Sequence, residues 1–271
     1  MSTRATTTKF PLAGFGGAVR SESLKTHPFG LIMRWMLPVV LCSVLGAAGL
    51  AVINQQARTE YHNPVDHVPL TLVLIGLLVI GTVWAAVNAA WLHLREVQSG
   101  QLYETYRCTP RRGAVVAARG LLGGVVSAVT GIIAVSGAFA VFAALEGGKA
   151  AEQIRETLLT RWDISLVWGL CMGLLAVMAV SVAVLVRSVP IGLGIIIGWF
   201  FIGEDLLQRI PGVGHLIGHL LPVQNAQFAA GLGDVGLAGT RPLALGLVVV
   251  ETVLLLVAAI VVESRRDVRA G

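Results

Sequence analysis

Charged residues are scarce in this chain. Asp, Glu, Lys and Arg make up only 13% of its 271 residues, whereas soluble domains carry about 25%. Hydrophobic residues supply 55% of the chain, and its mean hydropathy is +0.79. Such a composition argues against a water-soluble fold and predicts a membrane protein.

Several chemical signatures are also missing. Of three cysteines, Cys42 and Cys171 lie in apolar runs and Cys108 in a basic loop, a spacing that gives no disulfide or metal framework. No Gly-rich loop ends in Lys-Ser/Thr, and no His-Glu-x-x-His is present. We therefore expect no nucleotide-hydrolysing activity, metal or cofactor in this chain itself.

The basic residues do not suggest a nucleic-acid partner. The net charge is +5, but Lys and Arg lie between apolar runs and never form a basic face with interleaved aromatic residues. Ala, Gly, Val and Arg dominate while Lys is rare, which is typical of GC-rich bacterial genomes. The bacterial plasma membrane is the expected location.

Apolar residues gather into runs of about 20, the length that crosses a hydrocarbon core of about 30 Å. These runs predict an all-α polytopic membrane protein with a leader, 1–28, and a six-helix transmembrane domain, 29–271. The predicted spans are 30–54, 69–92, 114–145, 164–187, 189–209 and 242–263.

Basic residues predict the orientation. With both termini in the cytoplasm, 14 of the 20 Lys and Arg residues fall in cytoplasmic segments or span ends, as the positive-inside rule requires. The six exceptions are Arg58, Lys149, Arg155, Arg161, Arg209 and Arg241.

Two shorter segments stand out between the spans. The leader places Leu12, Phe15, Val19 and Leu24 among charged residues, which favours a short amphipathic helix on the membrane surface over a disordered tail. The stretch 203–241 is too polar to cross, yet its apolar pieces are broken by Gly and Pro, a pattern typical of re-entrant helices.

Four motifs together resemble the permease subunits of ABC exporters of the ABC-2 type. The second span ends in Glu96, then come Gly100, a short helix over 101–109, and the basic group Pro110, Arg111 and Arg112. The leader segment 14–25 resembles the amphipathic elbow helix of that family. Leu220, Leu221 and Pro222 ahead of the last span, and the closing Arg265, Arg266 and Asp267, are similar to further family motifs.

This resemblance implies an exporter of drugs, peptides, lipids or polysaccharides. Two permease copies, identical or not, would assemble with two ATPase subunits that bind ATP and Mg²⁺, and 101–110 would be the coupling helix. The coupling residues would be Glu96, Gly100, Leu102, Tyr103, Glu104, Tyr106 and Arg107. The tyrosines depart from the family pattern, and a solvated loop whose arginines only set topology is the simpler alternative.

A second group of candidates could line a pathway or a dimer interface: Gly194, Gly198, Glu204, Asp205 and Glu251. The glycines lie one turn apart and allow close helix approach, within one chain or between two. Glu251 is the only carboxylate deep inside a predicted span, which is costly and often functional, although a bond to a neighbouring helix would also explain it. His215 and His219, at i and i+4, are a weak zinc motif.

Two other functional classes remain open. An ATP-independent secondary transporter or channel would need polar residues along several spans and often an internal repeat, and neither is evident. An intramembrane enzyme would need an acid and base motif that the acidic residues and histidines do not form.

Overall fold

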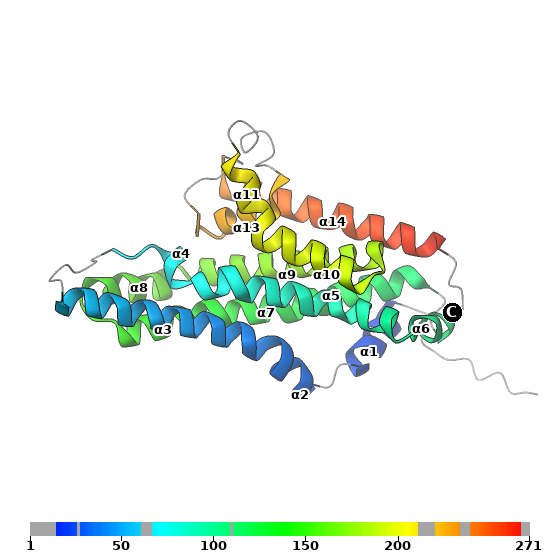
Figure 1. Ribbon diagram of the computed structural model, residues 1–271, viewed down its shortest axis with the longest axis horizontal. Coiled ribbons are helices and arrows are strands. Elements are labelled where there is room, and N and C mark those ends of the chain that lie inside the picture. Colours follow the sequence, from blue (N-terminus) through cyan, green and yellow to red (C-terminus); the bar gives the residue numbers. More distant parts are fainter. Residues whose placement is uncertain are drawn as a thin grey trace, which may run out of the picture.

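The computed structural model describes residues 15–25, 28–60, 67–108, 111–210, 220–233 and 239–266. Within these ranges the chain is almost entirely helical and contains no strand. Helices α3 (Leu37–Glu60), α5 (Thr82–Gln98), α7 (Arg112–Leu145) and α9 (Trp162–Val186) run side by side as an elongated bundle, with α10 (Val189–Gly198) and α14 (Arg241–Arg265) along one side (Figure 1).

Five helical segments are long and apolar enough to cross a membrane. They are Phe29–Glu60, Leu77–Gln98, Arg112–Leu145, Trp162–Val186 and Arg241–Arg265. The first contains the π-helical turn η1 (Ile32–Met36) after α2 (Pro28–Leu31), and the second begins with the π-helical turn η2 (Leu77–Gly81) after α4 (Leu70–Val73). These helices confirm the predicted all-α, multi-pass character of the protein.

The predicted span 189–209 is not a straight helix of spanning length. Its apolar part, α10, has 10 residues, which rise about 15 Å, or half of the hydrocarbon core. The π-helical turn η3 (Trp199–Gly203) then leads into α11 (Glu204–Arg209), which turns away from the bundle (Figure 1). Pro190 lies in the first turn of α10, as expected.

Close packing of α7 on α9 holds the centre of the bundle. A Cβ atom built on Gly169 would lie 2.7 Å from the carbonyl oxygen of Ala128, and one on Gly173 would lie 2.8 Å from that of Gly124. Only glycine fits at such contacts, which are typical of helix pairs inside membranes. The bundle therefore relies on glycines other than the pair on 189–209 that the sequence singled out.

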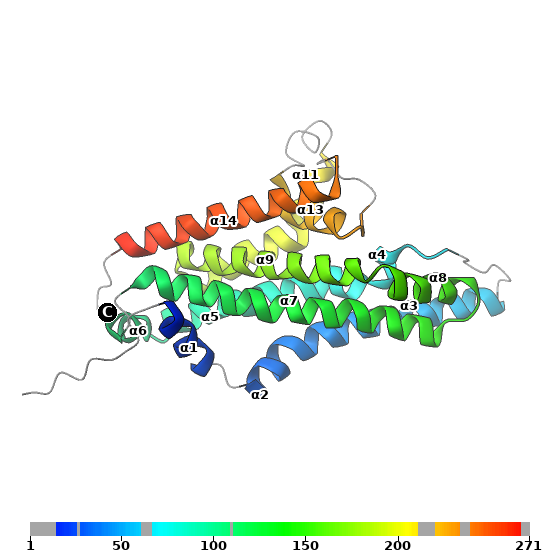
Figure 2. The same ribbon diagram turned by 180° about the vertical axis from the view of Figure 1, so that it is seen from behind.

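The two ends of the bundle differ. Helices α1 (Phe15–Lys25) and α6 (Leu102–Cys108) lie at one end, and α1 packs against α7 there (Figure 2). At the opposite end lies α8 (Lys149–Thr160), which the sequence analysis did not predict, although Ala150 and Ile154 are buried one turn apart. The Gln153 side chain bonds to the backbone N–H and C=O of Val68, at 3.3 Å each.

Candidate functional site

A group of buried charges joins α1, α5, α6 and α7 at the α6 end of the bundle. We call it the Arg119 cluster, and it comprises Glu22, Lys25, His93, Glu96, Thr105 and Arg119. Arg119 is fully buried (0% exposed), and its guanidinium pairs with Glu96 and, at 3.3 Å, with Glu22. A buried charge needs such partners because isolated burial is very costly.

Lys25 and Thr105 complete the cluster from the two short helices. The Lys25 ammonium lies 2.9 Å from Glu22 and 2.8 Å from Glu96, and the Thr105 hydroxyl donates to Glu96 at 2.8 Å. Two cations thus face two carboxylates, so these four side chains are balanced in charge. Glu96, only 3% exposed, is the residue that links all four helices.

The Arg119 cluster also fixes the state of His93. A nitrogen of the Arg119 guanidinium lies 2.8 Å from His93 Nδ1. Because arginine can only donate, Nδ1 must accept this hydrogen bond, and the imidazole proton is then assigned to Nε2. His93 is therefore a neutral part of the cluster.

A second buried group connects α6 to the end of α14. The Tyr106 hydroxyl donates to Glu263 at 2.6 Å, and Arg187, the residue after α9, donates to the same carboxylate at 2.5 Å. Burial of the ring and this hydrogen bond to Glu263 raise the pKa of Tyr106 well above its usual value, while Arg119 and Arg187 oppose the shift. The phenol therefore stays protonated and keeps donating.

Arginine side chains donate hydrogen bonds to backbone carbonyls at the same end of the bundle. The Arg266 guanidinium donates to the carbonyls of Val184 and Leu185, at 3.1 and 2.9 Å. These are among the last carbonyls of α9, which a basic side chain can satisfy. Arg112 in turn donates to the carbonyl of Arg266.

Helix α6 has one buried face and one exposed face. Leu102 and Tyr106 pack on Val115, with Val97 beside them. Gly100 has φ +70° in the turn before α6, a conformation that suits glycine. Tyr106 is only 6% exposed, but Tyr103 is 38% exposed. Of the two tyrosines expected to act together, only Tyr103 is available to a partner.

The exposed face of α6 adjoins a surface cavity. Glu104 and Arg107 pair with each other at 3.5 Å, and Arg107 also lies 5.8 Å from the centre of the Tyr103 ring. A cavity of about 720 Å³ lies between α1, the end of α5 and α6, and polar and charged residues line it. Its lining residues are Ser21, Lys25, Arg95, Glu96, Gln101, Glu104 and Thr105.

Glu204, a candidate pathway residue, has a structural role. Its buried carboxylate accepts the backbone N–H groups of Val223, at 2.9 Å, and Gln224, at 3.0 Å, and the indole N–H of Trp199, at 3.1 Å. Val223 and Gln224 lie in the first turn of α13 (Pro222–Ala229). Glu204 therefore caps α13 from α11 and holds the predicted re-entrant segment together.

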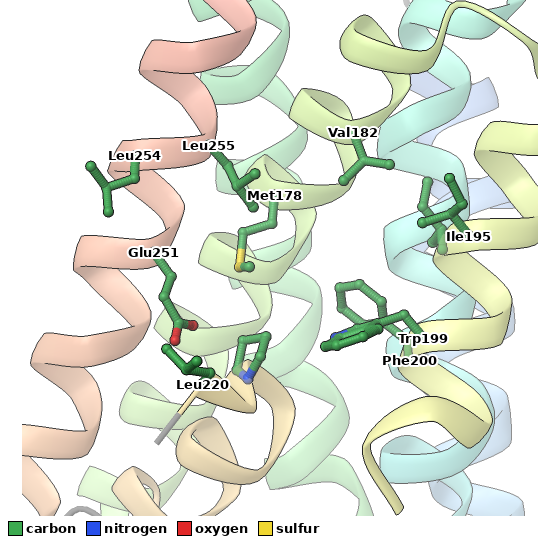
Figure 3. Close-up of a pocket in the computed structure, with 11 residues that line it drawn as sticks. Met178, Val182, Ile195, Trp199, Phe200, Leu220, Glu251, Leu254 and Leu255 are labelled. Atoms are coloured by element: carbon green, nitrogen blue, oxygen red, sulfur yellow. The ribbon is translucent and has the colours of Figure 1, made fainter. Parts of the chain in front are cut away.

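The other pathway candidates lie toward α10 and α14. Glu251 lines an apolar cavity between α9, α10 and α14 (Figure 3). Around Gly194 and Gly198 no described side chain comes within 4 Å of a Cβ built on either residue, so neither glycine packs against another described part of the chain. The side chains of Asp205 and Cys108, and residues Pro110, His215 and His219, lie outside the described residues.

Of the two buried groups at this end, the sequence analysis named only Glu96 and Tyr106 as site residues. It missed Glu22, Lys25, His93, Thr105, Arg119, Arg187 and Glu263. It counted Arg119 and Arg187 only as topology signals. Arg119 lies within the predicted span 114–145, five residues from its start, and an ionisable residue inside a span usually has a buried partner. The spacing gave no way to choose that partner, because Glu22 is 97 residues away.

Comparisons with known proteins do not assign a family. No protein-family model matches the chain, and no curated protein is significantly similar to it.

Proposed function

We propose that this chain is the permease subunit of an ATP-driven ABC exporter, with both termini in the cytoplasm of a bacterium. The Arg119 cluster is the observation that carries the proposal. It joins a short exposed helix, α6, to membrane-crossing helices through buried charges, which is what a transmission element requires. Two ATPase subunits and a second permease copy would complete the transporter.

In this mechanism an ATPase subunit binds the exposed face of α6. Tyr103, Glu104 and Arg107 supply an aromatic ring and both charges there, the kind of contacts that anchor protein interfaces. The polar cavity beside α6 supplies further contact surface. ATP-driven closure of the ATPase pair would then push on α6.

The push would reach the crossing helices by two routes. In the first route, a displacement of Thr105 would move Glu96 on α5 through their hydrogen bond, and Glu96 would move Arg119 on α7 through their ion pair. In the second route, a displacement of Tyr106 would move Glu263, near the end of α14, through their hydrogen bond. Because these contacts are buried and charged, they cannot slide without a large cost, so α6 and the helices would move together.

The remaining parts of the fold suit the same proposal. Helix α1 would be the elbow helix, and α10, η3 and α11 with α13 would make a sixth, broken crossing and its re-entrant return. Gly194 and Gly198, open toward the outside of the chain, would pack against the second permease copy, since exposed small residues let helices approach closely.

The test separates docking from folding. Tyr103→Ala and Arg107→Ala change only the exposed face of α6, so the chain should still insert in the membrane. Co-purification with the proposed nucleotide-binding subunit, and substrate-stimulated ATP turnover, should both fall about tenfold. Glu96→Ala should lower turnover while leaving docking less affected.

The matched control is Glu156→Ala, on the exposed face of α8 at the opposite end of the bundle, which should change neither property. Unchanged assembly and turnover in the α6 variants would reject α6 as the coupling helix. A genome without an adjacent ATPase gene would favour a secondary transporter instead.

A further inference from the structure

An apolar cavity of about 360 Å³ lies between α9, α10, η3 and α14. The start of α13 bounds it at one end. Met178, Leu254 and Leu255 form one side, and Trp199 and Phe200 face Glu251 from across the cavity (Figure 3). Trp199 has already used its N–H on Glu204. Among the described residues that line the cavity, Glu251 is therefore the one ionisable side chain.

The Glu251 carboxyl group has no partner within the described part of the chain. Both of its oxygens are shielded from solvent, and neither accepts or donates a hydrogen bond there. Glu251 comes ten residues after Arg241 at the start of α14, about 15 Å along the helix axis and so near the middle of a bilayer. An unsatisfied acid at that depth is costly.

We propose that this cavity binds a hydrophobic compound that carries one ammonium group. The ammonium would donate its hydrogen bonds to the two orphaned oxygens of Glu251 and balance the carboxylate charge. The apolar body would fill the space against Met178 and Leu255, and the Trp199 ring face would also favour a cation. This chemistry matches the common pattern of an apolar pocket with a few polar groups that orient the ligand.

The depth of the site and its charge favour a free amine over a lipid headgroup. A phosphatidylethanolamine headgroup would bring its phosphate next to Glu251 and would have to leave the membrane surface. A compound whose only polar group is the ammonium avoids both costs. The inference gives the substrate class of the proposed exporter, and its role in transport rests on that function.

Binding to the purified chain tests the site without any ATPase. The chain would be placed in phosphatidylcholine nanodiscs, whose headgroup has no N–H donor, and titrated with 1-adamantylamine, 1-adamantanol and 1-adamantanecarboxylate by calorimetry. These probes share one rigid apolar body. The amine should bind at least about tenfold more tightly than the alcohol, as expected for hydrogen bonds to a charged group, and the carboxylate should bind least.

Three variants locate the binding. Glu251→Gln keeps the side-chain volume and should remove the preference for the amine, while Asp163→Asn, an acid outside the cavity, should keep it. Ile195→Trp should fill the cavity and weaken the amine and the alcohol alike; Ile195 is 45% exposed, so the larger side chain should not prevent folding. Equal binding of the three probes, or an unchanged preference in Glu251→Gln, would overturn the proposal.

Two further experiments identify the molecule that occupies the cavity. Competition by added phosphatidylethanolamine would assign the ammonium to a lipid, contrary to a free amine. Cross-linking of Leu254→Cys between two copies, with no amine binding, would show that a second chain covers the cavity and would also overturn the site. Loss of α6 docking in the variants described above would leave these binding results unchanged, so the two proposals can fail separately.

Discussion

Arg119 holds its position through three different side chains: Glu22, His93 and Glu96. All three are buried, so the guanidinium replaces the water that these groups would otherwise bind. Removing one partner of a buried ion pair leaves the other charge uncompensated, which costs about 3–5 kcal/mol. At the scale of single residues, Arg119 is therefore the side chain on which the α6 end depends most.

Replacing Arg119 by Met should lower the free energy of unfolding by about 3–5 kcal/mol, measured by SDS titration of the purified chain in micelles. Lys25→Met should cost less because the Lys25 side chain is 31% exposed and water can solvate what remains. The double variant Arg119→Met with Glu96→Gln should recover part of the loss. Wild-type stability in Arg119→Met would contradict the role of the cluster.

Individual helices were predictable where their pattern is local. The sequence located three of the five long helices to within two residues, but the predicted spans 30–54 and 69–92 both end six residues short, and 69–92 begins eight residues early. It placed short helices over the leader and over 101–109, where α1 and α6 lie. It missed α8, and it did not foresee the break between α10 and α11. The apolar run continues from α10 through Trp199 and Phe200 of η3, so hydropathy alone does not reveal the π-helical turn.

Helix α13 provides a prediction at the scale of elements, because its first turn depends on a carboxylate from α11. Glu204→Ala leaves the N–H groups of Val223 and Gln224 without their acceptor, and loss of such a cap costs about 1 kcal/mol. Hydrogen exchange at 223–226 should then quicken about fivefold or more, while α7 should exchange as before.

Glu204→Asp serves as the comparison, since the shorter carboxylate keeps the charge but not the reach, and an intermediate rate is expected. If 223–226 exchanges at the same rate in all three chains, α13 does not depend on this cap.

The whole molecule places α6 and α8 at opposite ends of the bundle (Figure 1). With the orientation inferred from Lys and Arg, a membrane-impermeant thiol reagent should reach Cys108 only from the cytoplasm. Cysteines introduced at Lys149 and Gly233 should react only from outside. Cys42 and Cys171 would first be replaced by Ala, so that each chain carries a single thiol.

Labelling of Cys108 from outside would reverse the orientation and with it the proposed contact with an ATPase. Labelling of Lys149→Cys and Cys108 from one side would contradict the number of crossings between them.

The candidate site could be predicted only in part, and the reason is sequence distance. The exposed residues of α6 follow from a local motif, but the partners that bury its other face do not. Tyr106 meets Glu263 from 157 residues away, and Arg119 meets Glu22 from 97. A single sequence carries no signal for such pairs, so the sequence analysis gave Tyr106 the same coupling role as Tyr103.

The bond between Tyr106 and Glu263 also bears on how the protein is made. Glu263 lies near the end of α14, the last helix described, so α6 and Arg187 are synthesised long before their shared acceptor exists. Until α14 has entered the membrane, the Arg187 charge and the Tyr106 hydroxyl lack the acceptor that they share. An incomplete chain would thus present an open, polar end to the quality-control proteases of the cell, and insertion of the last helix would be the step that closes it.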